Sequence, residues 1–282
     1  MISETTSLHR ITQLPLNRDA EIFRHYAAFK LGVIAAVRHY AELLLPMVKR
    51  LIAESEHTSW IITGPGIATH TPAGANLLCW ELFNLYTRER NSKELHLIDI
   101  QYDNEATASI DYAKLGVADR LTERERLSRQ LVPDAEFQGR PILFVNDVCV
   151  TGAQQQTMEQ YFERAQAASV TWLYLIVVDP EIGRMKPDLE WEINFAPFED
   201  LLRFVSREEI QFTGKCILKL MHLSTAELEQ VLRALSSERR TRLLKLALLN
   251  GFRNLDDFHE QMELVRSYAT EMTVGDSQYR PQ

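Results

Sequence analysis

A carboxylate, a Thr-Gly turn and the start of a helix follow one another at the end of an apolar stretch near the middle of the chain. Residues 142–145 are hydrophobic, Asn146 and Asp147 come next, and Thr151 and Gly152 precede a segment of helical composition. Free backbone N–H groups at a helix N-terminus bind phosphate. A carboxylate at a strand tip accepts hydrogen bonds from the vicinal hydroxyls of a ribose. The segment therefore predicts a site for a phosphorylated sugar.

Residues 142–154 resemble the phosphoribosyl-pyrophosphate (PRPP) loop of type I phosphoribosyltransferases. That pattern has four hydrophobic residues, two acids, a few small residues and then Thr-Thr-Gly-Ala-Thr. The resemblance implies that Asp147 is the second acid and grips the ribose during catalysis, and that Thr151 to Ala153 hold the 5′-phosphate. The PRPP-binding residues that it implies are Asn146, Asp147, Val148, Cys149, Val150, Thr151, Gly152 and Ala153.

Three positions depart from this family pattern. Asn146 replaces the first acid, Val150 replaces the first threonine, and Gln154 replaces the last threonine. Asparagine can still donate to and accept from a hydroxyl group, but it brings no charge. The departures therefore concern catalysis more than fold. An ordinary buried strand that ends in a turn is the alternative to a PRPP site.

The resemblance to the family also implies functions for two further segments. The loop Gly64-Pro65-Gly66 would bind the pyrophosphate of PRPP through its backbone, and glycine permits the conformation that this requires. Segment 108–130 would be the counterpart of a loop that closes over the reacting centre, with Arg120 and Arg124 as catalytic contacts to the leaving pyrophosphate. The alternative for these arginines is a surface helix in which they pair with glutamates across turns.

The predicted fold is α/β: a three-layer, Rossmann-like type I phosphoribosyltransferase core with a mainly parallel sheet, a long N-terminal helix and a C-terminal helical extension. Apolar periodicity indicates a helix over 21–54, which Pro46 should kink or divide near Leu45. Thr71-Pro72 should cap and begin a helix that runs to about Arg90. The expected strands are 59–63, 94–100, 141–145, 170–179 (a central strand) and 191–195 (the closing strand).

The expected domain organisation divides the chain near residue 206. Residues 1–206 would form the phosphoribosyltransferase-like domain, with a loosely ordered arm and the first helix in 1–55. Residues 207–272 would form a helical extension for dimerisation or for a protein partner, and 273–282 a disordered tail. Several arginines make the extension locally basic, but a solvated helix pair with an apolar seam explains them better than a nucleic-acid face.

Composition narrows the function classes. A hydrophobic content of 45% suits a globular protein, and a formal net charge of −8 argues against non-specific nucleic-acid binding. Cys79, Cys149 and Cys216 lack metal-ligand spacing and indicate reduced thiols in a cytoplasmic protein. We find no signal-peptide pattern and no apolar run of about eighteen residues, so no membrane partner is expected.

Three functions remain open from the sequence. The first is an enzyme that transfers phosphoribosyl from PRPP to a nitrogenous base and releases pyrophosphate, with Mg²⁺ carried by PRPP and no protein metal site. The second is a non-catalytic sensor or regulator that binds PRPP or a nucleotide. The third is an effector or accessory subunit of a bacterial stress or defence system. Residues 112–115 with Arg120 and Arg124 are similar to phosphoribosyltransferase-like proteins encoded in bacterial tellurium-resistance and stress-response neighbourhoods.

Overall fold

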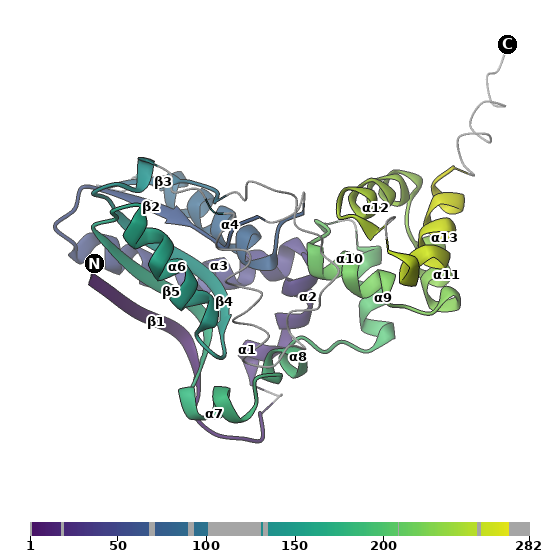
Figure 1. Ribbon diagram of the computed structural model, residues 1–282, viewed down its shortest axis with the longest axis horizontal. Helices are drawn as coiled ribbons and strands as arrows, with labels where there is room; N and C mark the ends of the chain where they lie inside the picture. Colours follow the sequence, from purple (N-terminus) through teal and green to yellow (C-terminus); the bar gives the residue numbers. More distant parts are fainter. Residues whose placement is uncertain are drawn as a thin grey trace, which may run out of the picture.

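A five-stranded sheet with only parallel pairings lies at the centre of the fold (Figure 1). The computed structural model describes residues 2–17, 20–67, 71–89, 93–100, 131, 135–207, 209–252 and 255–270. Within these ranges the strands are β1 (Ile2–Ile11), β2 (Ser59–Thr63), β3 (Glu94–Leu97), β4 (Pro141–Cys149) and β5 (Ser169–Val178). They are ordered β1-β5-β4-β2-β3. The predicted α/β class and mainly parallel sheet are confirmed.

Helices cover both faces of the sheet. Alternate residues of β4 point to opposite faces: Leu143 belongs to one apolar core, while Phe144 belongs to a second core with Phe162. The first core includes residues of α3 (Ile34–Glu54) and α4 (Gly74–Arg88), and the second includes those of α6 (Ala153–Arg164). Strands buried on both faces read as continuous apolar runs, as β4 and β5 do. The predicted three layers are present.

The remaining described elements are short helices. They are α1 (Glu21–Arg24), α2 (Tyr26–Leu31), η2 (Ala135–Phe137), α7 (Pro180–Met185), α8 (Leu189–Ile193), α9 (Phe198–Ser206), α10 (Gly214–Met221), α11 (Thr225–Ala234), α12 (Ser237–Leu249), η4 (Asp256–Phe258) and α13 (His259–Thr270). Figure 1 shows the C-terminal helices beside α2. Leu220 and Leu232 share one apolar core with Phe29 of α2, so these helices extend the core that the N-terminal helices begin.

The N-terminal segment is a strand and not the loosely ordered arm that we predicted. β1 pairs with β5 over its whole length, from Ile2 opposite Ser169 to Ile11 opposite Val178. Its side chains are mostly polar and half-exposed because it lies at the sheet edge, so no apolar run marks it. Backbone hydrogen bonds and β-branched threonines stabilise such a strand without a buried face.

Residues 191–195 do not form the predicted closing strand. They lie in and just after the helix α8, in which Leu189 and Ile193 are buried one turn apart. Trp191 and Phe195 are 41% and 49% exposed. The four-residue spacing of the buried pair is helical. The strand was predicted because apolar and polar residues alternate over 191–195, but Trp191 and Phe195 are exposed.

The predicted helix over 21–54 is three helices. It is divided at His25, between α1 and α2, and at Gly32, which has a φ of 91° and closes α2, and not near Leu45. Pro46 lies on the exposed face inside α3. α4 begins at Gly74 and not at Pro72, because Asn76 Oδ1 accepts the Ala73 N–H at 2.8 Å and caps the helix there.

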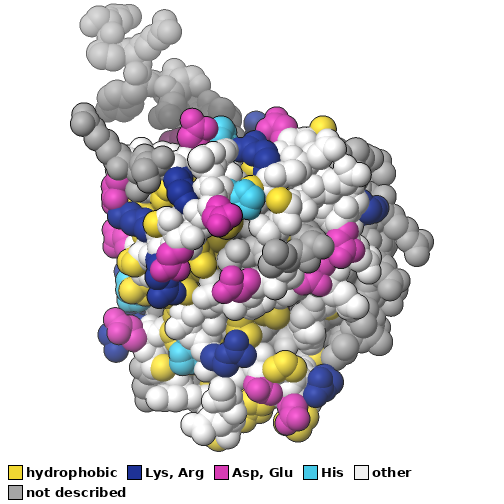
Figure 2. Space-filling model, turned by 90° about the vertical axis from the view of Figure 1, so that its left-hand side faces the viewer, with side chains coloured by type: hydrophobic (Ala, Val, Ile, Leu, Met, Phe, Trp, Pro, Cys, Tyr) yellow, Lys and Arg dark blue, Asp and Glu magenta, His cyan; other side chains and the backbone are white. Residues whose placement is uncertain are grey.

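Charged side chains of both signs are spread over one face of the molecule (Figure 2). On the face that Figure 2 shows, the described acidic and basic side chains are mixed, and neither sign gathers in one broad patch. No helix in the described ranges has both the length and the apolar character needed to span a membrane.

Candidate functional site

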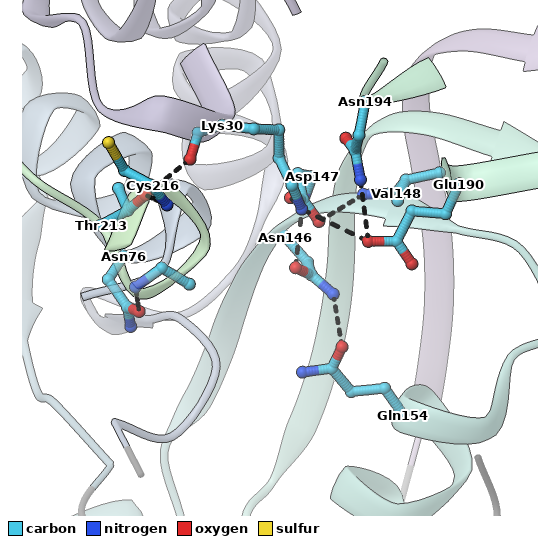
Figure 3. A network of polar contacts seen from close by, with 11 residues as sticks. Lys30, Asn76, Asn146, Asp147, Val148, Gln154, Glu190, Asn194, Thr213 and Cys216 are labelled. Carbon is cyan, nitrogen blue, oxygen red and sulfur yellow. Dashed lines mark hydrogen bonds and ion pairs between the residues drawn. The ribbon is translucent and has the colours of Figure 1, made fainter. Parts of the chain in front are cut away.

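Strand β4 continues past the end that the sequence predicted, and this sets the directions of the two polar residues. Its pairing with β5 extends to Cys149 opposite Val177, with Asn146 opposite Tyr174. Consecutive residues of a strand face opposite sides of the sheet. Asp147 therefore points towards the α2 and α8 side, and Asn146 towards the α6 side, as Figure 3 shows.

The carboxyl end of β4 opens into a cavity of about 180 Å³. Its lining comes from four parts of the chain: residues 146–155, Pro65 and Gly66 after β2, Lys30 of α2, and Glu190 of α8. Nearly all the predicted PRPP-binding residues thus line one cavity. Gly64 does not line it, because it is buried behind the loop against Asn76 and Cys79. Arg120 and Arg124 lie outside the described residues.

The turn at the start of α6 is a tight loop with a left-handed glycine. Gly152, the N-cap residue of α6, has a φ of 75°. The Ala153 N–H contacts Thr151 Oγ1 at 3.4 Å, a long hydrogen bond. Burial raises the pKa of the Cys149 thiol, and a backbone hydrogen bond from Gly152 to that thiol opposes the rise. Sulfur is a weak acceptor, so both amides have partners that a phosphate oxygen can replace.

A glycine of α7 holds this turn from behind. A Cβ at Gly183 would lie 2.0 Å from the carbonyl oxygen of Val150, so only glycine permits the contact. Sequence reasoning did not identify Gly183, because its role depends on the position of α7 against the loop and not on a local pattern.

The Asp147 carboxylate is part of a buried ionic network (Figure 3). Its Oδ1 accepts the Val148 N–H at 2.8 Å, and its Oδ2 pairs with the Lys30 ammonium group. Lys30 Nζ also lies 3.4 Å from Glu190 Oε1. The side chains of Lys30, Asp147 and Glu190 are 12%, 8% and 14% exposed. Burial alone would lower the pKa of Lys30, but the two carboxylates outweigh it and raise that pKa to about 12.

Asn146 is occupied by other contacts. Its Nδ2 donates to Gln154 Oε1 at 3.1 Å, and its Oδ1 accepts the Asp147 N–H at 2.9 Å. Asn146 and Gln154, two of the three residues that depart from the family pattern, are therefore hydrogen-bonded to each other on the α6 side of the sheet.

Two buried polar atoms beside the network have no hydrogen-bond partner among the described residues. They are the hydroxyl of Tyr26 and Oδ1 of Asn194, whose side chains are 0% and 1% exposed. Burial raises the pKa of Tyr26, and the charges of Asp147 and Glu190 raise it further. Leaving such an atom unsatisfied costs about 1–3 kcal/mol.

The sequence analysis missed Lys30 and Glu190. They are 160 positions apart, and neither lies in a recognisable motif. Lys30 falls in an apolar helical period, and Glu190 falls in the stretch just before the segment that we predicted as a strand. Only the packing of α2 and α8 over the end of β4 brings them to Asp147.

The oxygen ligands in this cavity fit a magnesium ion that arrives with its substrate. No group of three or more His, Cys, Asp or Glu that could hold a metal gathers in the described part of the chain. Mg²⁺ prefers oxygen, keeps several waters and needs only one or two protein carboxylates when a phosphate supplies the rest. Asp147 and Glu190, the carboxylates that line the cavity, would contact such an ion through the sugar or through its waters, while the phosphates of PRPP carry it.

A parallel sheet whose central strand leads through a tight glycine turn into a helix, with a carboxylate near the strand end, is the arrangement expected of a phosphoribosyltransferase-type α/β protein. The family model described as PRTase ComF-like matches residues 2–265. The chain belongs to this ComF-like phosphoribosyltransferase family.

Solved structures give a weaker similarity. A hypoxanthine-guanine phosphoribosyltransferase from Bacillus anthracis shares 12% identity, with 54% of this chain and 73% of that chain covered and a TM-score of 0.32. A hypoxanthine phosphoribosyltransferase from Staphylococcus aureus shares 10% identity, with 54% and 68% covered and a TM-score of 0.31. No curated protein matches the chain. The family assignment depends on the match over residues 2–265.

Proposed function

We propose that this chain binds PRPP and transfers its phosphoribosyl group to a nitrogenous base, with release of pyrophosphate. One observation supports this most directly: Asp147, the turn 150–153 and the loop residues Pro65 and Gly66 come from separate parts of the chain and line one cavity. That arrangement offers a carboxylate for the ribose hydroxyls, amides for the 5′-phosphate and backbone for the pyrophosphate.

The reaction needs no protein nucleophile. A nitrogen atom of the base attacks C1 of the ribose while the bond from C1 to the pyrophosphate oxygen breaks, and the bonding electrons leave with the pyrophosphate. The attacking nitrogen then loses its proton to solvent. The protein holds the two substrates in line and surrounds the developing charges with fixed groups.

Each group has a defined task in this proposal. Asp147 orients the ribose through its hydroxyls, residues 151–153 hold the 5′-phosphate, and Pro65 and Gly66 cradle the pyrophosphate. Arg120 and Arg124 are proposed to stabilise the leaving pyrophosphate. Bound Mg²⁺ would neutralise part of the pyrophosphate charge.

Calorimetric titration of PRPP with Mg²⁺ into the wild-type, Asp147→Ala and Asp188→Ala proteins tests the site. Asp188 is exposed and makes no side-chain cap on α8, so its variant is the matched control. We expect Asp147→Ala to weaken binding by at least about tenfold, because it removes hydrogen bonds to a charged group. Equal affinity in all three proteins would refute the proposed site.

A non-catalytic sensor of PRPP or a nucleotide is the second candidate, and one observation favours it. Both polar ends of Asn146 already make a hydrogen bond within the protein and the side chain carries no charge, so this position should hold the ribose less strongly than an acid would. Pyrophosphate release in the presence of a panel of purine, pyrimidine and pyridine bases separates the two candidates. PRPP binding without release for any base would favour the sensor.

A further inference from the structure

On the α2 and α8 side of the sheet, the site contains a carboxylate that the PRPP motif does not include. Glu190 lines the same cavity as Asp147, and its Oε1 lies 3.4 Å from the ammonium group that also pairs with Asp147. Two carboxylates that share one ammonium group are close enough to share one small ligand. Figure 3 shows both of them directed at Lys30, with Asn146 directed away.

We propose that Glu190 provides the second carboxylate of the ribose site, in place of an acid at position 146, so that Glu190 and Asp147 together bind the vicinal hydroxyls of the sugar. This inference rests on the proposed binding of a phosphoribosyl compound. It goes beyond that proposal by assigning sugar recognition to α8, a helix that lies outside the PRPP motif.

The charges of the cavity support this assignment. Among the described residues that line the cavity, Asp147 and Glu190 carry two negative charges and Lys30 carries one positive charge, and all three side chains are largely buried. Burying an excess negative charge is unfavourable unless a ligand brings hydrogen-bond donors or a cation. Two ribose hydroxyls are such donors, and they can replace the ammonium group at Asp147 while Lys30 stays beside Glu190.

Two unsatisfied atoms beside the network leave room for a bridging water behind the carboxylates. The Tyr26 hydroxyl and Asn194 Oδ1 are buried without a partner among the described residues. Tyr26 is one helical turn from Lys30 on α2, and Asn194 Nδ2 lies 3.5 Å from Glu190 Oε1. Neither residue lines the cavity, so a buried water between these atoms and the network is what would satisfy them.

The test compares ribose 5-phosphate with 2-deoxyribose 5-phosphate, which lacks one of the two hydroxyls. Affinities are measured by calorimetry for the wild-type, Glu190→Gln and Glu192→Gln proteins. Glu192 lies on the same helix but pairs with Lys186 and does not line the cavity, so it is the matched control. We expect the wild type to prefer the ribose compound, and Glu190→Gln to reduce its affinity at least about tenfold and to remove most of the preference.

Glu190→Asp is a second test variant, for the case that Glu190→Gln does not fold. It keeps a negative charge beside Lys30 but withdraws the oxygens by one methylene group, so it should fold and still bind ribose 5-phosphate more weakly than the wild type. Unchanged ribose affinity and preference in folded Glu190 variants, with binding weakened in Asp147→Ala, would overturn the role of Glu190 and leave the proposed function standing. Absence of PRPP and sugar-phosphate binding by the wild type would overturn both.

Discussion

Replacing Lys30 with methionine should lower the free energy of unfolding by about 3–5 kcal/mol at neutral pH, because breaking a buried ion pair from one side leaves an uncompensated charge. Here the substitution leaves two carboxylates, Asp147 and Glu190, whose side chains are only 8% and 14% exposed. Methionine fills a volume similar to that of the lysine stem, so the loss reports mainly the charge.

The pH dependence of the free energy of unfolding shows how much of this loss comes from the charge of Lys30. The pKa of Lys30 is raised from 10.5 to about 12 in the folded protein, because the two carboxylates outweigh the opposing effect of burial. A difference of this size corresponds to about 2 kcal/mol. Since the folded pKa is the higher one, this stability is present in full below pH 10.5 and is lost as the pH rises to about 12. The stability gap between wild type and Lys30→Met should therefore narrow over that interval.

Urea unfolding of both proteins at a series of pH values from neutral to about 12 measures the gap. Buried Tyr40 and Cys216, whose pKa values are raised chiefly by burial, titrate in both proteins and largely cancel in the difference. The matched control is Lys49→Met. Lys49 pairs with Glu89 at the surface, where the side chains are 37% and 49% exposed, so its loss should be no more than about 1 kcal/mol. Equal losses for both variants at neutral pH, or a gap that does not change with pH, would refute the reasoning.

Three further predictions concern the supports of the site. Gly183→Ala places a Cβ 2.0 Å from Val150 O and should shift the phosphate turn, which calorimetry would detect as a PRPP affinity at least about tenfold weaker; an unchanged affinity would show that the turn tolerates displacement. Thr213→Ala removes a helix cap and the hydrogen bond to the Lys30 carbonyl at 2.7 Å, and urea unfolding should show a loss of about 1–2 kcal/mol. Deleting 207–282 should prevent folding because it removes part of the shared apolar core, and a cooperative unfolding transition in the remaining protein would contradict this.

Local patterns were sufficient to predict strand β4, the turn at Gly152 and the helix that follows it. The apolar run of β4, the Gly152 turn and α6 lie within one short segment, so their structure depends mostly on neighbouring residues. The capping box at Ser224 is equally local, because Ser224 and Glu227 bond to each other within one turn. Strand β1 lacks such a signal, since its stability comes from pairing with β5 at the sheet edge.

The two partners in the ionic network of Asp147, Lys30 and Glu190, could not be predicted because they lie far apart in the chain. Lys30 and Glu190 meet only after α2 and α8 have packed over the end of β4. The arginines of the C-terminal helices illustrate the same limit: Arg239 and Arg240 donate to the backbone carbonyls of Val205 and Leu235. Their sequence pattern alone cannot distinguish that structural task from an exposed basic face.

The helices after residue 207 contribute to the site itself as well as to the core. Thr213 Oγ1 donates to the Lys30 carbonyl, and Lys219 Nζ donates to the Asn194 carbonyl, each at 2.7 Å. One helix, α10, thus contacts both the segment that carries the ammonium group and the segment that follows Glu190. We therefore infer that α10 fixes the distance between Lys30 and Glu190, and with it the geometry in which two carboxylates face one sugar.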